Sequence, residues 1–528
     1  MHFRCTIVLS LVITVAAFKD NDLYGISHIG MTVKNLELST KYYQDVFGAM
    51  LVEDLSTGDE GVSGDSHYYR IFQKELLENQ TVPDISSTGT HEVRWNFLLL
   101  SNFMIMLMEF RNRESALIYY DEDLRVGNAF IGGTHACVAA SPRVNPLQQM
   151  ENIIERQEIV SEMDVDKKDF ITYFGPEPEN FAERRTRPLD NKLLSFDNFK
   201  IASMRGPVGE KWEITYRKGS GFFEDFRPFC QHKGVYPPLL DVHPENEYQK
   251  FLSQQMGGLH HINAVVENIT DSLKFYTKVL GGKLNTDKID SKYPLDKSFY
   301  DLIHQDEILE AKKLGMSPNL EFGILPPVFE GPSQPLIDVY FIAFDNAYFE
   351  PYRYYINSTY QSVPPNLYRR EISPAYVNIM HTGFWVKDDI DMATFIQNME
   401  QKSAGFGFDK VRANRAVEVG TFGQSVKGNQ YSDPFPDTHR LAGFDYTFFK
   451  GPSGEQNVLV QFKGKAKNAL QAAMEKYGAL STAFPSTNPW NWAGFNRTCE
   501  WVQESSQGTA SSVKMSYLIL LLSMSFFI

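Results

Sequence analysis

The sequence predicts an α+β fold assembled from four similar modules, each consisting of a strand, a helix and then further strands. Two observations carry this prediction: an internal duplication, and a histidine-containing strand at the start of every module. His28 and His261 lie 233 positions apart, and so do Gly48 and Gly281. Because a constant offset is the signature of an internal repeat, we interpret the two segments as copies of one unit.

The first module shows the expected plan. A short strand containing His28 is followed by an amphipathic helix, whose apolar residues recur three and four apart and which ends at Gly48. Residues 93–100 and 103–110 are strong strand candidates, and the two polar residues between them suit a hairpin turn.

The other modules begin at His135, His261 and His381. A Gly-Pro-x-Gly-Glu turn starts at Gly206 in the second module and recurs at Gly451 in the fourth, each time before a strand. The third module is predicted to end with the strand 337–344. We therefore expect two paired-module domains, 23–217 and 258–463, joined by a proline-rich connector at 218–257.

Both ends of the chain resemble processing signals. Residues 1–17 have the basic start, apolar centre and small-residue exit of a signal peptide. A polar tail, 464–512, precedes a short hydrophobic end, 513–528, which favours a GPI anchor over a membrane span. We therefore expect a secreted or cell-surface glycoprotein, with four candidate glycosylation sites: Asn79, Asn268, Asn357 and Asn496.

Charge and cysteine content restrict the partners. The net charge of −14 argues against nucleic acid and against anionic membranes, so membrane contact is expected only through the lipid anchor and a small molecule is the expected partner. Three cysteines remain after removal of the signal peptide, which allows at most one internal disulfide. Cys230 with Cys499 is the favoured pair, because Cys137 lies in an apolar strand.

Two glutamates turn the repeated histidines into a candidate metal site. Glu109 ends an apolar strand, and Glu213 occupies a similar place in the second module. A buried carboxylate needs a cation or a hydrogen-bonding partner, although each glutamate could instead face solvent and each histidine could be an ordinary core residue. Imidazole nitrogens with carboxylate oxygens suit one divalent ion: Fe, Mn, Ni, Co or Zn.

These modules resemble the vicinal oxygen chelate superfamily, which includes glyoxalase I, extradiol dioxygenases and bleomycin-resistance proteins. The resemblance lies in the repeated His-x-x-x-x-Val-x-Asn opening, the Val-Phe-Gly helix end and the Gly-Pro-x-Gly turn. It implies that paired modules curl into half-open barrels. It also implies a metal in the first domain, held by His28, Glu109, His135 and Glu213, with Glu213 or Glu109 as the catalytic proton carrier.

The second domain departs from that pattern. Alignment of its sequence places Ala343 and Val458 where the first domain has Glu109 and Glu213. Because two neutral histidines hold a hard divalent ion poorly, no metal is expected there.

Three functions are compatible with these residues. The first is a metal-dependent isomerase or lyase that acts on a small substrate with vicinal oxygens through a metal-stabilised enolate. The second is an extradiol-type Fe(II) dioxygenase, and the third is a non-catalytic extracellular ligand-binding protein.

Overall fold

The structure is a computed structural model in which fifteen stretches of the chain are described: residues 22–58, 61–63, 91–100, 103–112, 134–139, 172–174, 199–208, 210–217, 258–284, 293–294, 336–344, 346–355, 380–413, 435 and 437–480. The predicted signal peptide, the connector and the hydrophobic C-terminus lie outside these residues. So do Cys230, Cys499 and three of the four candidate glycosylation sites, Asn79, Asn357 and Asn496. Within the described ranges, no helix is long and apolar enough to cross a bilayer.

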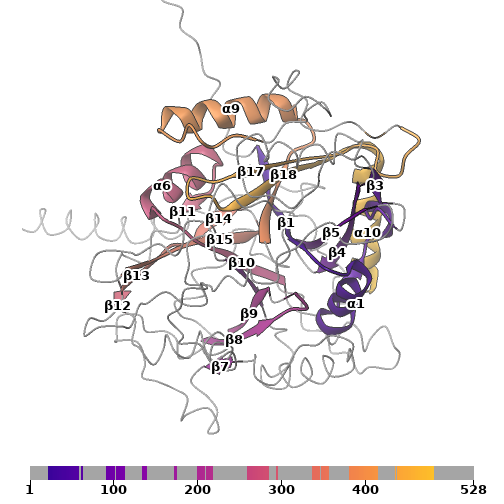
Figure 1. Ribbon diagram of the computed structural model, residues 1–528, viewed down its shortest axis with the longest axis horizontal. Helices are drawn as coiled ribbons and strands as arrows, with labels where there is room; N and C mark the ends of the chain where they lie inside the picture. The colour runs from indigo at the N-terminus through magenta and orange to yellow at the C-terminus, as the bar shows by residue number, and fades with distance from the viewer. Residues whose placement is uncertain are drawn as a thin grey trace, which may run out of the picture.

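Two sheets form the body of the molecule (Figure 1). The first sheet has the strand order β17-β18-β16-β1-β5-β4-β2, with β3 also paired to β4. Its strands are β1 (Leu23–Thr32), β2 (Met50–Leu51), β3 (Val62–Ser63), β4 (His91–Leu100), β5 (Phe103–Asn112), β16 (Met380–Val386), β17 (Phe444–Lys450) and β18 (Gln456–Phe462).

The second sheet has the order β11-β14-β15-β10-β6-β9-β8-β7, and β12 and β13 extend it beside β15. Both sheets are open, as expected for half-open barrels. The strands of the second sheet are β6 (Thr134–Ala139), β7 (Thr172–Phe174), β8 (Phe199–Arg205), β9 (Lys211–Arg217), β10 (Gly258–Val265), β11 (Lys283–Leu284), β12 (Tyr293–Pro294), β13 (Leu336–Val339), β14 (Ile342–Phe344) and β15 (Ala347–Tyr355).

The modules pair differently from the sequence-based prediction. The first module joins the fourth through antiparallel β1 and β16, and the second joins the third through antiparallel β10 and β6. The expected partnerships within 23–217 and within 258–463 are therefore not the ones that build the sheets. Because the apolar opening strands resemble one another, the prediction assumed that modules adjacent in sequence pair with each other.

Glycines at the centre of the first sheet explain its pairing. Gly30 lies opposite His381, and Gly383 lies opposite His28. A Cβ atom at Gly30 would lie 1.8 Å from His381 Nε2, so only glycine leaves room for the imidazole across the strand. The first and fourth modules both carry this His-x-Gly pattern.

The helices follow the predicted amphipathic segments. In α1 (Leu36–Phe47), Asn35 caps the first turn by accepting a hydrogen bond from the Leu38 N–H, and Gly48 ends the helix with φ of 71°. The repeat continues in α6 (Ile269–Lys274), which leads into the π-helical turn η3 (Phe275–Val279). The short η1 (Glu53–Leu55) and α9 (Met392–Gly405) complete the helices before the C-terminal region.

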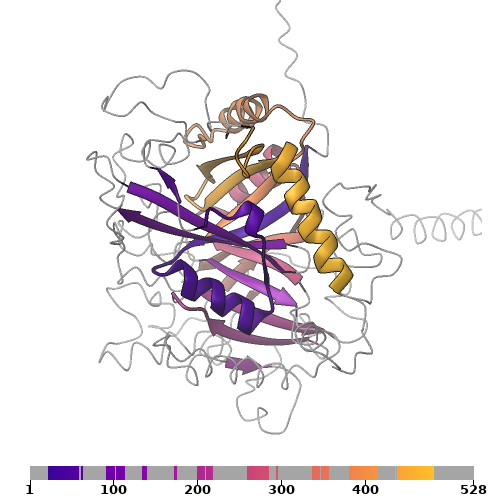
Figure 2. The same cartoon turned by 90° about the vertical axis from the view of Figure 1, so that its right-hand side faces the viewer.

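The predicted polar tail begins with a packed helix, α10 (Gly464–Leu480). Ala466, Leu470 and Met474 on this helix are buried in an apolar cluster with residues of the first sheet. Figure 2 shows α10, in yellow, running alongside that sheet. Residues 464–480 are therefore part of the folded body, and only the stretch after them keeps its prediction as a tail.

The side chains of β5 alternate between two apolar clusters. Ile105 and Leu107 pack into a cluster shared with α1, α6, α9 and the second sheet. Met104, Met106 and Met108 face the opposite cluster, which α10 covers. This period of two fixes the direction of every polar residue on β5.

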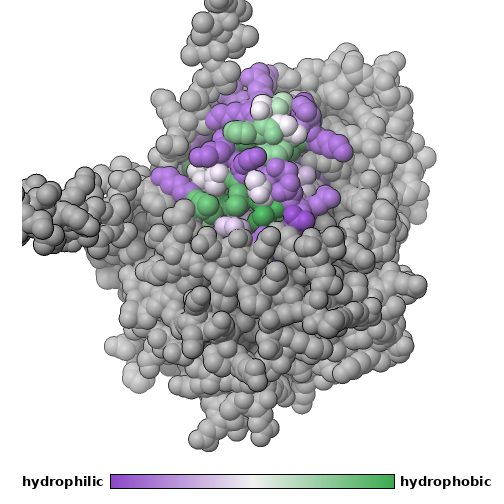
Figure 3. All heavy atoms as spheres, turned by 90° about the vertical axis from the view of Figure 1, so that its left-hand side faces the viewer, coloured by the Kyte–Doolittle hydropathy of each residue, from purple (hydrophilic) through white to green (hydrophobic). Residues whose placement is uncertain are grey.

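The described surface is mixed in character. Figure 3 shows one face on which hydrophilic and hydrophobic residues are interspersed. Among the described residues, Phe406 is the one large hydrophobic residue classed as exposed, at 45%. The apolar side chains of the described segments are therefore largely used in the two clusters.

Candidate metal centre

Two histidines meet at the centre of the second sheet. His135 of β6 and His261 of β10 are 1% and 4% exposed, and their Nε2 atoms lie 3.3 Å apart. Their ring centroids are 5.4 Å apart, with the planes at 77°. The antiparallel seam between β6 and β10 thus brings together the opening strands of the second and third modules.

Each histidine is joined by a glutamate from a neighbouring parallel strand. Glu213 of β9 lies beside Cys137, and Glu350 of β15 lies beside Asn263, two residues after the histidine in both modules. Glu213 Oε2 is 3.4 Å from His135 Nε2 and 3.7 Å from His261 Nε2. Glu350 Oε2 is 3.0 Å from His261 Nε2 and 3.8 Å from His135 Nε2.

Burial and mutual attraction set the charges of this cluster. Burial raises the pKa of Glu213, but the neighbouring imidazoles of His135 and His261 have the larger, opposite effect and lower this pKa to about 2. Burial lowers the pKa of His261, but Cys137 and Glu350 raise it well above its usual range. Glu213 is therefore an anion at neutral pH, as a metal ligand must be.

The donors fit a divalent cation. Ligand atoms of His135, Glu213 and His261 all lie within 4.8 Å of one another, and Glu350 Oε2 is close to both imidazoles. Within the described chain, buried His135 Nδ1 has no hydrogen-bond partner, and Glu350 Oε2 makes an ion-pair contact with His261 Nε2 without an aligned hydrogen bond. Two nitrogens and two oxygens from four side chains suit Fe, Mn, Ni, Co or Zn.

A second histidine supports the orientation of His261. His260 Nδ1 lies 2.8 Å from His261 Nδ1, so one of these two nitrogens carries the hydrogen and the other accepts it. When His261 is the donor, its Nε2 lone pair is free to face Glu350, Glu213 and His135. His260 is thus placed to fix the ring and tautomer of a metal ligand.

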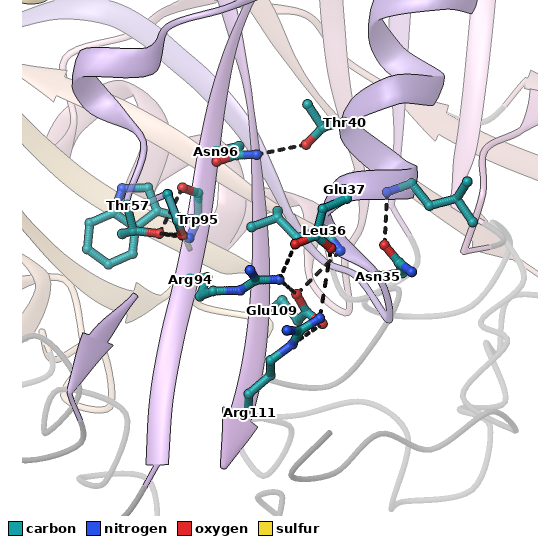
Figure 4. Close-up of polar contacts among 12 residues, drawn as sticks. Asn35, Leu36, Glu37, Thr40, Thr57, Arg94, Trp95, Asn96, Glu109 and Arg111 are labelled. Carbon is teal, nitrogen blue, oxygen red and sulfur yellow. Dashed lines mark hydrogen bonds and ion pairs between the residues drawn. The ribbon is translucent and has the colours of Figure 1, made fainter. Parts of the chain in front are cut away.

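The structure brings His135 and Glu213 together but places Glu109 elsewhere. Arg94 Nη2 and Arg111 Nε each lie 2.6 Å from a carboxylate oxygen of Glu109 (Figure 4). The Leu36 N–H, at the start of α1, also points at this carboxylate, 3.4 Å away. Glu109 is a buried ion-pair residue on the α1 side of the first sheet, and its predicted roles as metal ligand and proton carrier are not supported.

The register explains this difference. Gly30 is two residues after His28 on β1. The residue beside Gly30 on the neighbouring strand β5 is Met106. Glu109 lies three residues farther along, and an odd step in a strand turns the side chain to the other face. The carboxylate was needed at position 106, where the sequence has methionine.

The third module supplies the acid that the alignment missed. Ala343, which the sequence alignment placed at the ligand position, lies on the short strand β14. The true counterpart is Glu350 on β15, beyond the predicted last strand. Val458 is placed as the sequence predicted, because it lies beside Gly383, two residues after His381.

His28, the fourth predicted ligand, lies in the first sheet with His381. Their ring centroids are 5.4 Å apart, and among the described residues no carboxylate occupies the matching positions on β5 and β18. The sequence did contain a signal for the correct pairing. Modules one and four have glycine two residues after the histidine, whereas modules two and three have Cys137 and Asn263.

Comparisons with known proteins agree with this architecture. Residues 258–307 match the family described as Glyoxalase/Bleomycin resistance protein/Dioxygenase superfamily. No curated protein sequence matches the chain.

Three solved structures illustrate the likeness. Glyoxalase I from Zea mays is 14% identical over 88% of this chain and 97% of its own, with a TM-score of 0.37. A putative dioxygenase from Bacillus subtilis subsp. subtilis str. 168 is 11% identical over 84% of this chain and 88% of its own, also at 0.37. A fosfomycin resistance protein, FosX, from Listeria monocytogenes, complexed with Mn(II) and sulfate, is 13% identical over 37% of this chain and 93% of its own, at 0.17.

The family match lies within the third module. The matched stretch contains β10, with His261, and the following α6. Residues 258–307 therefore match the Glyoxalase/Bleomycin resistance protein/Dioxygenase superfamily, in agreement with the resemblance seen in the sequence motifs.

Proposed function

We propose that this protein is a metal-dependent isomerase or lyase of the glyoxalase-like class, acting on a small substrate with two vicinal oxygens through an enolate. The observation that carries the proposal is the meeting of His135, His261, Glu213 and Glu350 at one buried point of the second sheet. Such a set suits a divalent ion, because imidazole nitrogens and carboxylate oxygens lie close together in a buried place.

The four side chains would hold Fe, Mn, Ni, Co or Zn. The bound ion would act as a Lewis acid toward the two substrate oxygens. His135 and His261 belong to rigid neighbouring strands, so their spacing is set before substrate arrives. Phe341 and Tyr348 pack around His260 and His261 and limit access of water to this side of the site.

One of the two glutamates would move the proton. A carboxylate oxygen would take the proton from the carbon that bears the hydroxyl group, and the same acid would return it to the former carbonyl carbon. The hydroxyl proton would pass to the other substrate oxygen, so that the isomerisation balances. Glu213 and Glu350 are both placed for this role, and they replace the pair Glu213 and Glu109 expected from sequence. Glutamine at either position keeps the shape but cannot accept the proton, so the two variants identify the carrier.

A dioxygenase is the second candidate. Two compact three-residue groups share His261 among the described residues: Cys137, His260 and His261, and His135, Glu213 and His261. The latter is a two-histidine, one-carboxylate set. That set is typical of non-haem Fe(II) oxygenases. Oxygen uptake with catechol in the iron-loaded protein would favour this reaction over isomerisation.

Elemental analysis of the purified full chain tests the proposal. After loading with Mn, Ni, Co, Zn or Fe(II) and gel filtration, we expect one divalent ion per chain in the wild type and a large loss in Glu213→Gln and Glu350→Gln. Glu400→Gln is the matched control. Glu400 lies on α9 and is also buried, but its carboxylate accepts a hydrogen bond from the Ala413 N–H.

The loaded protein is then given small α-hydroxyketones, and exchange of the α-hydrogen with solvent is followed by NMR. A metal-free wild type would exclude the enzyme and favour the third candidate, a ligand-binding protein. Metal without exchange or oxygen uptake would exclude both reactions for these substrates.

We also propose that a lipid anchor holds the protein on the outer surface of the cell and that the protein carries N-linked glycans. The support is the sequence of the two ends and the four sequons, of which Asn268 lies exposed at the cap of α6. Release of the protein from intact cells by a phosphatidylinositol-specific phospholipase is the expected result. Retention on the cells, or a cytosolic location, would contradict it.

A further inference from the structure

The first sheet holds a second buried pair of histidines with nearly the same geometry as the pair in the metal centre. The rings of His28 and His381 have centroids 5.4 Å apart and planes at 86°, compared with 5.4 Å and 77° for His135 and His261. His28 is 0% exposed and His381 is 1% exposed. Both pairs lie at the seam where two opening strands meet.

The imidazole nitrogens of this second pair lack partners. In the described part of the chain, His28 Nε2 and both ring nitrogens of His381 are buried without a hydrogen bond. His28 Nδ1 is satisfied by Ser27 Oγ at 2.8 Å, so its Nε2 is the nitrogen left over. A buried polar atom without a partner is destabilising, so the pair is unfavourable as ordinary core residues.

The donors beside the pair differ from those of the metal centre. Met106 lies beside Gly30 in the same way as Glu350 lies beside Asn263. Gly30 and Asn263 are each two residues after the histidine of their strand. On the other side of the seam, Val458 lies beside Gly383. The two carboxylates are thus replaced by one thioether and one hydrocarbon side chain.

The surroundings of the pair are apolar. The ring of Phe97 lies 5.6 Å from that of His28, and the ring of Phe448 lies 5.0 Å from that of His381. Met106 and Val458 are each 1% exposed. A divalent ion would enter this place without an anionic ligand, which is unfavourable, whereas a soft monovalent ion carries less charge and prefers sulfur and imidazole.

We propose that His28, His381 and Met106 form a binding site for a soft monovalent metal ion, Cu(I). The two neutral imidazoles and the thioether would complete a three-coordinate, dry site. The proposal is independent of the proposed function, because it uses no residue of the second sheet. One chain would then offer two sites with opposite preferences, one for hard divalent ions and one for copper.

Competition with a chromophoric Cu(I) chelator, under reducing and anaerobic conditions, tests this site in the full chain. Cu(I) can also bind cysteine, so the measured quantity is the difference between variants. We expect Met106→Leu to lose one tight equivalent, with at least a tenfold drop in affinity. Met108→Leu is the matched control: it makes the same change on the same strand and face, but beside Thr32.

A second readout does not depend on the variants. Cu(I) is diamagnetic, so the imidazole NMR signals of His28 and His381 should shift on addition of one equivalent to the wild type. Unshifted signals would overturn the proposal, and so would equal copper binding by wild type and a folded Met106→Leu. Glu213→Gln should bind Cu(I) like wild type, so failure here and failure of the divalent site are distinguishable.

Discussion

Glu350 Oε2 on β15 lies 3.0 Å from His261 Nε2 on β10. These two strands of the third module are parallel neighbours in the second sheet. The matching place in the first sheet is Met106, beside Gly30. The two sheets share one plan for the histidines and differ in the residues on the flanking strands. This difference, rather than the histidines, is the basis on which we propose a different ion for each sheet.

His260 should control the affinity of the divalent site without being a ligand. His260→Leu removes the hydrogen-bond partner of His261 Nδ1, so we expect divalent metal affinity to fall about 10- to 100-fold. His260→Asn should recover most of it, because the amide oxygen lies about where Nδ1 was. Isothermal titration with Mn or Zn measures both, and similar loss in the two variants would mean that His260 only fills space.

Glu109 should matter for stability and not for metal. Glu109→Gln leaves Arg94 buried beside a neutral group, so we expect a loss of about 3 kcal/mol in the free energy of unfolding. Glu37→Gln, which removes an exposed partner of the same arginine, should cost less than about 1 kcal/mol. Urea unfolding gives both values. Loss of divalent metal from folded Glu109→Gln would restore the ligand role expected from sequence.

The sequence predicted the modules well because each is defined by local signals. Asn35, the helix pattern and Gly48 sit within one short stretch, and Asn268 repeats the cap in the third module. The partner of each module depends instead on contacts between residues hundreds of positions apart. Gly30 and His381 had to be recognised as a complementary pair before the pairing could be read.

The site was half predicted for the same reason. His135 and Glu213 belong to one module, so their proximity followed from its internal plan. His261 and Glu350 came from a different module and were missed. Glu350 also lies outside the strand 337–344, which the sequence predicted as the last strand of the third module, although its segment forms a central strand of the second sheet. A single misplaced strand moved the ligand position from Glu350 to Ala343.

Gly30 should tolerate no side chain. In Gly30→Ala the new methyl group would meet the His381 ring at 1.8 Å, which forces the seam apart, and we expect a loss of at least about 3 kcal/mol. Gly405→Ala is the comparison, because nothing lies within 4 Å of a Cβ there. That change, at the end of α9, should be neutral or stabilising by up to about 1 kcal/mol. Thermal unfolding of both variants checks the contrast.

Asp388 should make part of the stability sensitive to acid. Partial burial raises the pKa of Asp388, but hydrogen bonds from Lys467 and Tyr24 and the charge of Lys467 lower it below its usual range. A carboxyl group with a depressed pKa stabilises the fold above its unfolded-state pKa of about 4, and this contribution disappears as the pH falls through the folded-state value.

Asp388→Asn therefore should lose about 1 kcal/mol at pH 7 and little at pH 2. Lys467 lies on α10, so the same pair joins that helix to the turn that follows β16. Unfolding titrations at a series of pH values measure the difference between wild type and variant. An equal loss at every pH would show that the ion pair contributes no pH-dependent stability.

The nesting of the modules has a consequence for biosynthesis. β1 needs β16, which is made more than three hundred residues later, whereas β6 and β10 are much closer in the chain. Closing the longer loop costs more chain entropy and must wait for the ribosome to finish the fourth module. The second sheet can thus assemble during translation, while β1, which can already pair with β5, waits for the last part of the chain to cover its other edge.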